Sequence, residues 1–327
     1  MTTTTLVHHA QRALPLWGFS PHFACTLLAH SENFVFHVVP EHAEGTAPSY
    51  VLRLHRPQYH SEQAIVSEIQ WLLALTHAGM AVPRPIIGLD GNFVQLFDAT
   101  VPLYATMLAY IPGKNGEGIP ATEELYEKIG AIAAQFHSQA TAWQLPAGFT
   151  RPTWGFSECL GPQARWGDWR VAIPKGLQAS LPLVEQAVTE VRVRLEHYGK
   201  SRENSGLIHS DIRVANVLEN NASLAVIDFD DASFGWFMFD CAASFSFCED
   251  NPCLATWVAA WLRGYRAARG GRFPTLADED LIPCFVIMRR LSLLAWMATR
   301  KKHPPEDTSF AEATVELARR FLHRQLL

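Results

Sequence analysis

The residues best suited to chemistry lie between positions 207 and 231. This segment reads LIHSDIRVANVL, then a polar ENNAS turn, then LAVIDFDD. Apolar pairs on both sides of the turn predict a β-hairpin, and its open ends carry Asn216 and Asp228. An amide oxygen and a carboxylate that meet beside a second carboxylate, Asp211, suit a hard cation such as Mg²⁺. Because Mg²⁺ in proteins usually keeps phosphate oxygens as ligands, the segment also predicts a phosphorylated nucleotide.

A β-rich first part of the chain must position one side of this site. Runs of β-branched and aromatic residues predict strands at 33–39, 50–54, 93–97 and 106–110. A Gly/Ala/Pro-containing connection at 41–48 is typical of a loose hairpin loop. Apolar periodicity predicts a helix from about Ser61 to Thr76, which the Val-Pro-Arg-Pro sequence after Ala81 ends. Pro112-Gly113 closes this part.

The rest of the chain is mostly helical by periodicity. Helices are predicted at about 121–143, 183–197, 239–247, 254–268, 280–299 and 308–325. Residues 150–170 hold three tryptophans among glycines and prolines, which predicts an irregular aromatic loop. We therefore predict two domains, 1–110 and 111–327, which agrees with the length of 327 residues.

Bulk properties restrict the partners. A net charge of −5 without a basic stripe gives no support for nucleic-acid binding. The first residues lack the basic start and apolar run of a signal peptide, and apolar stretches such as 254–262 and 281–288 are shorter than a membrane span. We expect a cytoplasmic protein with no nucleic-acid or membrane partner. Its oligomeric state, monomer or dimer, stays open.

The pattern His209-x-Asp211-x-x-x-x-Asn216, followed by Ile227-Asp228, resembles the catalytic and metal loops of the protein-kinase-like fold. Its apolar flanks and Asp-Phe-Asp-Asp ending resemble the aminoglycoside phosphotransferase superfamily, in particular its homoserine kinase-like and choline kinase-like members. The resemblance covers nearly the whole chain. It implies an α+β, protein-kinase-like bilobal fold. A small antiparallel β-sheet N-lobe with one main helix binds nucleotide, and a larger, mostly helical C-lobe holds the catalytic residues and the substrate.

The resemblance implies a role for each residue of the catalytic segment. Asp211 would accept the proton of the acceptor hydroxyl, while Asn216 and Asp228 would hold Mg²⁺ on the phosphates of ATP. Arg213 would stabilise charge on the transferred phosphoryl group. His209 would be a packed histidine that holds the loop, and Asp240 would accept backbone N–H groups of the catalytic loop. Two readings stay open for Asp230 and Asp231: they contact a metal or the substrate, or they form a solvated turn.

The nucleotide side departs from protein kinases in two places. Ser31 and Asn33 lie where a phosphate-covering loop is expected, but no G-x-G-x-x-G is present. Arg53 stands where protein kinases carry a lysine, with Glu68 as its expected partner. Two alternatives stay open here: Glu62 as the partner, and Arg53 as an ordinary surface arginine. The backbone at 108–111, with Leu108 and Tyr110, would bind adenine.

The leading hypothesis is a kinase acting on the hydroxyl of a small molecule: an amino acid, an amino alcohol or an aminoglycoside-like compound. A bacterial stress-response-type Ser/Thr protein kinase and a nucleotide-binding pseudokinase scaffold are the alternatives. Aromatic and arginine residues of the second part are candidates for the acceptor wall: Trp154, Trp166, Trp169, Arg289, Arg290 and Trp296.

Overall fold

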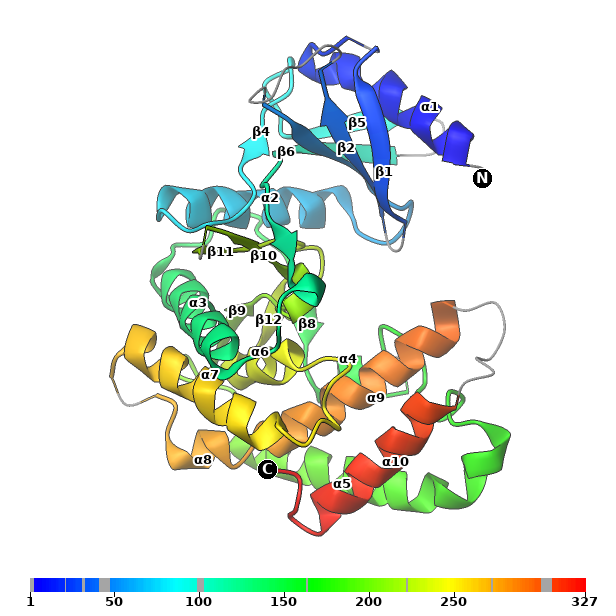
Figure 1. Ribbon diagram of the computed structural model, residues 1–327, viewed down its shortest axis with the longest axis vertical. Helices are drawn as coiled ribbons and strands as arrows, with labels where there is room; N and C mark the ends of the chain where they lie inside the picture. Colours follow the sequence, from blue (N-terminus) through cyan, green and yellow to red (C-terminus); the bar gives the residue numbers. More distant parts are fainter. Residues whose placement is uncertain are drawn as a thin grey trace. The chain divides into compact units, whose positions relative to one another are not determined.

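The structure is a computed structural model (Figure 1), which describes residues 3–20, 22–30, 33–40, 48–98, 103–162, 164–221, 223–271, 273–300 and 308–327. The chain forms two compact units. Unit 1 contains Met1–Lys114, Trp143–Arg151 and Leu218–Asp230. Unit 2 contains Asn115–Ala142, Pro152–Val217 and Asp231–Leu327. The predicted domain boundary between residues 110 and 111 stays a prediction.

Unit 1 is built on a six-stranded sheet of order β1-β2-β3-β6-β4, with β5 also paired to β6. Its strands are β1 (Ala24–His30), β2 (Phe34–Val39), β3 (Tyr50–Leu54), β4 (Pro85–Ile86), β5 (Val94–Asp98) and β6 (Leu103–Ala109). All of these pairs are antiparallel. The four predicted strand runs are therefore confirmed.

One face of this sheet is covered by a helix that the sequence analysis did not predict, α1 (Thr3–Ala13), continued by the short 3₁₀ turn η1 (Leu14–Trp17) (Figure 1). Side chains from the helix, the turn and the central strands form a shared core: Leu6, Ala10, Ala13, Leu14, Trp17, Phe36, Val38, Leu52, Leu54, Ala105 and Met107. Because successive strand residues point to opposite faces, Arg53 and Thr106 lie on the other face, away from this core.

The predicted helix of unit 1 is α2 (Glu62–His77), and the side chain of Ser61 caps it by accepting the Ala64 N–H at 3.2 Å. The predicted hairpin is confirmed as the pair β10 (Val217–Asn220) and β11 (Ser223–Val226), and β7 (Lys114–Asn115) is a further short strand. The Val226 N–H donates to the Ala81 carbonyl at 3.1 Å, so the hairpin is fastened to the segment after α2.

Unit 2 is mainly helical, as predicted. Its α-helices are α3 (Glu123–Ala142), α4 (Phe156–Leu160), α5 (Leu181–Tyr198), α6 (Phe237–Ser244), α7 (Leu254–Arg269), α8 (Leu276–Glu279), α9 (Ile282–Arg300) and α10 (Ser309–Leu322). Unit 2 also contains the 3₁₀ turns η2 (Gly116–Gly118), η3 (Lys175–Ser180) and η4 (Val214–Asn216). A small sheet of β8 (Thr153–Trp154), β12 (Ser233–Trp236) and β9 (Ser205–Ile208) lies among the helices.

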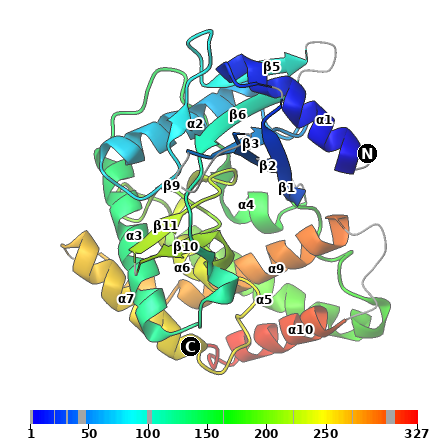
Figure 2. The same cartoon turned by 45° about the horizontal axis from the view of Figure 1, so that its top comes forward.

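Two glycines let α3 and α7 pack with their backbones nearly touching (Figure 2). A Cβ added at Gly130 would lie 2.0 Å from the Trp261 carbonyl oxygen, and one added at Gly264 would lie 1.8 Å from that of Glu127. Any larger residue would force the helices apart. An N-terminal antiparallel sheet followed by a helix-rich part confirms the predicted α+β fold class, with α1 as an addition.

The segment Leu276–Thr299 is long and apolar enough to cross a membrane by length and composition, whereas the sequence predicted only shorter apolar stretches. However, 78% of its most apolar window is buried inside the protein. This is typical of a core helix.

Candidate active site

The catalytic loop of unit 2 follows β9 and is held at its base by a buried carboxylate. The His209 N–H donates to Asp240 Oδ2 at 3.0 Å, and the Ser210 N–H donates to Asp240 Oδ1 at 2.7 Å. His137 Nε2 lies 3.0 Å from Asp240 Oδ2. These contacts confirm the predicted role of Asp240. They also stabilise Ser210 in the left-handed region, at φ 68°, which a residue other than glycine adopts only at a cost of about 1 kcal/mol or more.

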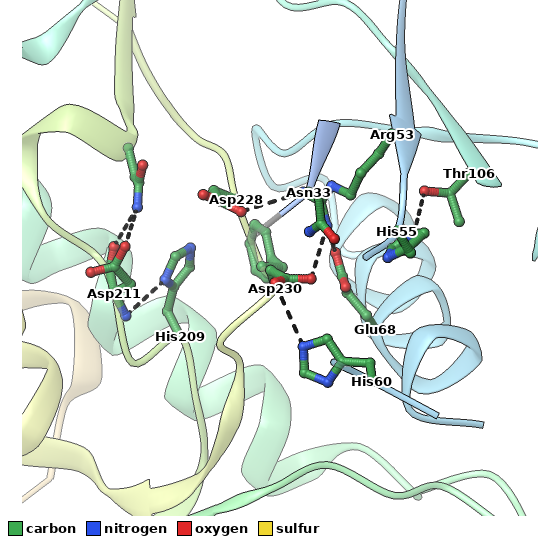
Figure 3. Close-up of polar contacts among 12 residues, drawn as sticks. Asn33, Arg53, His55, His60, Glu68, Thr106, His209, Asp211, Asp228 and Asp230 are labelled. Carbon is green, nitrogen blue, oxygen red and sulfur yellow. Dashed lines mark hydrogen bonds and ion pairs between the residues drawn. The ribbon is translucent and has the colours of Figure 1, made fainter. Parts of the chain in front are cut away.

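His209 is a packed residue, as predicted. Its side chain is fully buried and stacks on Phe136 with ring centroids 6.4 Å apart. His209 Nδ1 accepts the backbone N–H of Asp211 at 3.3 Å (Figure 3). The imidazole therefore orders the backbone of Asp211, the residue whose carboxylate the sequence assigns to proton transfer.

Both oxygens of the Asp211 carboxylate are engaged. The Asn216 amide donates to Oδ2 at 2.7 Å, and Arg289 Nη2 donates to Oδ1. Arg213 Nε lies 3.4 Å from Oδ2. The structure thus brings the two predicted catalytic residues, Asp211 and Arg213, together with the predicted metal ligand Asn216.

The amide of Asn216 is oriented by these bonds in a way that suits a metal ligand. Its Nδ2 donates to both the Asp211 carbonyl, at 2.9 Å, and the Asp211 carboxylate. Because the amide nitrogen donates these two bonds, the amide oxygen is the side-chain atom that can bind a cation. A Cβ added at Gly116 would lie 1.9 Å from the Val214 carbonyl oxygen, so only glycine permits this close approach to the turn that carries Asn216.

Two neighbouring arginines of α9 that the sequence assigned to one acceptor wall have different partners. Arg289 contacts Asp211, whereas Arg290 donates to Glu249 at 2.7 Å and to Thr314 at 3.0 Å. Adjacent helix residues point about 100° apart, and the two guanidinium groups reach different surroundings. Arg289 is thus a contact of the catalytic loop.

The predicted wall tryptophans are mostly buried. Trp154, Trp166 and Trp169 are 1%, 7% and 0% exposed, and the Arg289 guanidinium lies 5.3 Å from the Trp166 ring centroid. Trp296 is only partly buried. Their predicted role in acceptor binding stays a prediction, and packing accounts for most of their surface.

In unit 1, Arg53 lies among three carboxylates (Figure 3). Its Nη1 is 2.7 Å from Glu68 Oε1 and 3.6 Å from Asp230 Oδ1, and its Nη2 is 3.4 Å from Asp228 Oδ1. Glu62 instead accepts the Tyr104 hydroxyl at 3.0 Å, so Glu68 is the partner. Arg53 is 5% exposed, which shows that the surface alternative is wrong.

Burial and charge act in opposite directions in this cluster. Burial lowers the pKa of the Arg53 guanidinium, but Glu68, Asp228 and Asp230 raise it, and the net pKa is raised. Burial alone would raise the pKa of Asp230. The hydrogen bond from His60 and the charge of Arg53 together lower the pKa by a larger amount, so the net pKa is below its ordinary value. Asp230 is 5% exposed, which excludes the solvated turn for this residue.

Asp228 is positioned differently from the other two carboxylates. Its side chain is 50% exposed, and its backbone is in the left-handed region at φ 65°. A strained backbone at an accessible carboxylate is a common feature of functional sites. Among the described residues, no three His, Cys, Asp or Glu side chains gather as a metal centre. The predicted ligands are an amide oxygen at Asn216 and a carboxylate at Asp228, and both are ligand types that Mg²⁺ takes together with phosphate. A metal site that joins the two residues stays a prediction.

The backbone after Asp228 is fastened by Arg151, a residue that the sequence analysis did not identify. Its Nη1 donates to the Ala64 carbonyl at 2.9 Å, and its Nη2 donates to the carbonyls of Phe229, at 3.3 Å, and Asp230. Arg151 is 6% exposed. It therefore links the start of α2 to the segment that carries Asp228, and no sequence motif marks it.

The other predicted nucleotide contacts are less defined. Ser31 lies outside the described residues, and Asn33 uses its side-chain oxygen to accept the Arg56 N–H at 3.2 Å. Leu108 lies in β6, paired with Val51. The Tyr110 N–H donates to the Ser49 carbonyl at 3.0 Å, so this donor is engaged within unit 1. Adenine binding by these residues stays a prediction.

A pH effect arises from His55, which lies on the Arg53 face of the sheet and bonds Thr106 at 3.0 Å (Figure 3). Burial, followed by the nearby Arg53 charge, lowers its pKa from 6.5 to about 3. The unfolded chain therefore takes up a proton that the folded chain refuses, and stability falls as pH drops below about 6.5.

We expect the pH dependence of the unfolding free energy to be weaker in His55→Asn, which keeps a polar contact for Thr106 but does not titrate. Between pH 6 and 4, wild type should lose up to about 1.4 kcal/mol per pH unit more than the variant. Urea unfolding at several pH values measures the difference. Parallel curves for the two proteins would show that His55 already titrates normally in the folded state.

The chain resembles known proteins over most of its length. Residues 25–271 match the model of the phosphotransferase enzyme family, APH. Amicoumacin kinase of Bacillus subtilis (strain 168) is 25% identical over 228 residues, which is 68% of this chain and 62% of that protein. The aligned part therefore spans less than two thirds of the length of this relative.

Solved structures extend the comparison. The structure of a microcompartment-associated aminopropanol kinase matches with 34% identity and a TM-score of 0.88, covering 99% of both chains. An amicoumacin kinase in complex with AMP-PNP, Ca²⁺ and its ligand matches with 19% identity and a TM-score of 0.77, covering 99% of this chain and 94% of that chain. The second match supports the fold alone.

Proposed function

Because this chain belongs to the phosphotransferase enzyme family, we propose that it transfers the γ-phosphate of ATP to the hydroxyl group of a small amino alcohol. The superfamily predicted from the sequence is confirmed, and the protein is a small-molecule kinase of that family. The acceptor is the part that we propose. Amino alcohols were one of three acceptor classes that the sequence left open.

One observation carries the choice of acceptor. The aminopropanol kinase matches at 34% identity over 99% of both chains, whereas the spectinomycin phosphotransferase structure matches at 15% identity with a TM-score of 0.65. Acceptor pockets depend on side chains rather than on the fold. The relative with the greater shared sequence along the whole chain is therefore the better guide to the acceptor.

The catalytic residues have defined tasks in this proposal. The acceptor oxygen bonds to the γ-phosphorus, the bond from that phosphorus to the oxygen bridging to ADP breaks, and the hydroxyl proton passes to the Asp211 carboxylate. Asn216 and Asp228 would hold Mg²⁺, which neutralises charge on the phosphates when it is bound. Arg213, beside Asp211, supplies positive charge for the transferred group. Arg53, paired with Glu68, belongs to the nucleotide side.

A panel of acceptors tests the proposal. Purified protein with ATP and Mg²⁺ is offered 1-amino-2-propanol, ethanolamine, choline, homoserine, spectinomycin and a protein acceptor, and ADP release and phosphorylated product are both measured. We expect the highest kcat/KM with a short amino alcohol. Preferred transfer to the protein acceptor would support the protein-kinase alternative. Tight ATP binding without any transfer would support the pseudokinase scaffold and exclude our proposal.

A further inference from the structure

We propose that Arg289 is a positioning residue for phosphate transfer, which fixes the Asp211 carboxylate in the orientation needed to receive the acceptor proton. This inference rests on the proposed function, because Asp211 matters only if a hydroxyl is the acceptor. Arg289 lies in α9, 78 residues after Asp211 in the sequence. No motif connects the two residues.

The Arg289 guanidinium donates hydrogen bonds to three different residues. Besides its bond to Asp211 Oδ1, its Nη1 donates to the Ser210 carbonyl at 3.3 Å, and its Nε donates to Ser246 Oγ at 2.8 Å. The guanidinium lies 5.3 Å from the Trp166 ring centroid. The residue is 1% exposed. A buried planar group that donates from all three of its nitrogens has little freedom to move, so it fixes the position of its partner.

The bond from Arg289 adds a restraint that Asn216 alone does not give. Asn216 holds Oδ2 of Asp211, and a carboxylate held at one oxygen still rotates about its last side-chain bond. Arg289 holds the second oxygen from a different element of unit 2. With both oxygens bonded, the direction of the lone pairs that receive the proton is set before the acceptor arrives. Such pre-orientation is a large part of catalysis.

Lysine would not replace Arg289 fully. The guanidinium reaches the Asp211 carboxylate, the Ser210 carbonyl and Ser246 at once, because its donors form a rigid fork. An ammonium keeps the charge but bonds from a single point. The change Arg289→Lys therefore separates orientation from charge, which removal of the side chain would not do.

Arg290 is a matched control. It is the next residue of α9, it is also 1% exposed, and it also pairs with a carboxylate, Glu249, at 2.7 Å. Within the described part of the chain, its hydrogen-bond partners are Glu249, Thr314 and the Phe310 carbonyl, all of which lie outside the catalytic loop. Any effect that comes only from disturbing a buried arginine should therefore appear equally in Arg289→Lys and Arg290→Lys.

We expect Arg289→Lys to lower kcat by about 10- to 100-fold, the size of loss that a misplaced catalytic group gives. KM for ATP and the affinity for AMP-PNP should change less than about twofold, because Arg289 acts on the acceptor side. Arg290→Lys should keep kcat within about twofold of wild type. Equal losses of kcat in both variants, accompanied by equal losses of melting temperature, would overturn the proposal.

A double-mutant cycle gives the decisive readout. If Arg289 acts through Asp211, Arg289→Lys should lower activity in the wild-type background but cause no further loss in the Asp211→Asn background. Full losses in both backgrounds would show that Arg289 acts elsewhere.

Failure of the proposed function is recognised separately, because wild type would then phosphorylate no amino alcohol. Arg289 would in that case be tested by a crystal structure of Arg289→Lys. We expect a rotated Asp211 carboxylate and unchanged contacts between Asp240 and the loop backbone. An Asp211 carboxylate in its original orientation would overturn the positioning role.

Discussion

Replacing Asp211 with asparagine is expected to lower kcat by about 10³-fold or more, while the affinity for AMP-PNP stays within about threefold of wild type. Asparagine keeps the shape of the side chain and an oxygen for Arg289, but it cannot take up the acceptor proton. The change tests the proton acceptor without opening a cavity. Product formation from the preferred amino alcohol measures kcat, and calorimetric titration with AMP-PNP measures nucleotide binding.

The change Asp211→Ala is a useful companion, because it should also abolish transfer but at a structural cost. It leaves Arg289, 1% exposed, without its carboxylate, and a buried charge that loses its partner costs about 3–5 kcal/mol. Both changes remove the negative charge that faces Arg289, so both variants should melt earlier than wild type. The loss should be smaller in Asp211→Asn, because its amide oxygen still accepts a hydrogen bond from Arg289. Turnover that persists in both variants would exclude Asp211 as the proton acceptor.

The second large effect concerns stability. We expect Arg53→Met to lower the free energy of unfolding by about 3–5 kcal/mol, because the buried carboxylates of Glu68 and Asp230 would lose the charge that faces both. Methionine has a similar length and is apolar, so the loss reflects charge rather than a cavity. Urea unfolding followed by tryptophan fluorescence measures it.

Arg56 provides the control for this prediction. It lies three residues away in the same segment, and its side chain is exposed. Arg56→Met should change the unfolding free energy by less than about 0.5 kcal/mol. A similarly small effect for Arg53→Met would mean that the three carboxylates do not depend on Arg53. Affinity for AMP-PNP should fall in Arg53→Met alone, since Arg53 also orders Asp228.

Local features were predictable from the sequence because short-range rules decide them. The hairpin at 217–226 follows from a polar turn between apolar pairs, and α2 from its apolar period and its serine cap. The pairing of Arg53 with Glu68 and the bonds from the catalytic loop to Asp240 were predicted from the family pattern and appear in the structure. These residues occupy positions that the motif itself defines.

The features that sequence reasoning missed depend on contacts between distant segments. Helix α1 buries mainly Leu6 and alanines, which give a weak apolar pattern. Arg289 and Arg290 are neighbours with the same chemistry, and only the packing of α9 decides that Arg289 meets Asp211. Arg151 bonds to backbone carbonyls, which leave no trace in residue types. These contacts could be predicted only from the three-dimensional packing of segments that are far apart in sequence.

Unit 1 gathers three stretches of chain that are far apart in sequence, and this has a consequence for protein engineering. A fragment that ends at Lys114 would keep the sheet, α1 and α2, but it would lack Asp228, Asp230 and the Arg151 side chain that bonds to the start of α2. Trp71 would also lose the Phe229 ring, 5.3 Å away. Unit 1 is thus not a transplantable module. Exchanging it between relatives requires exchanging all three stretches together.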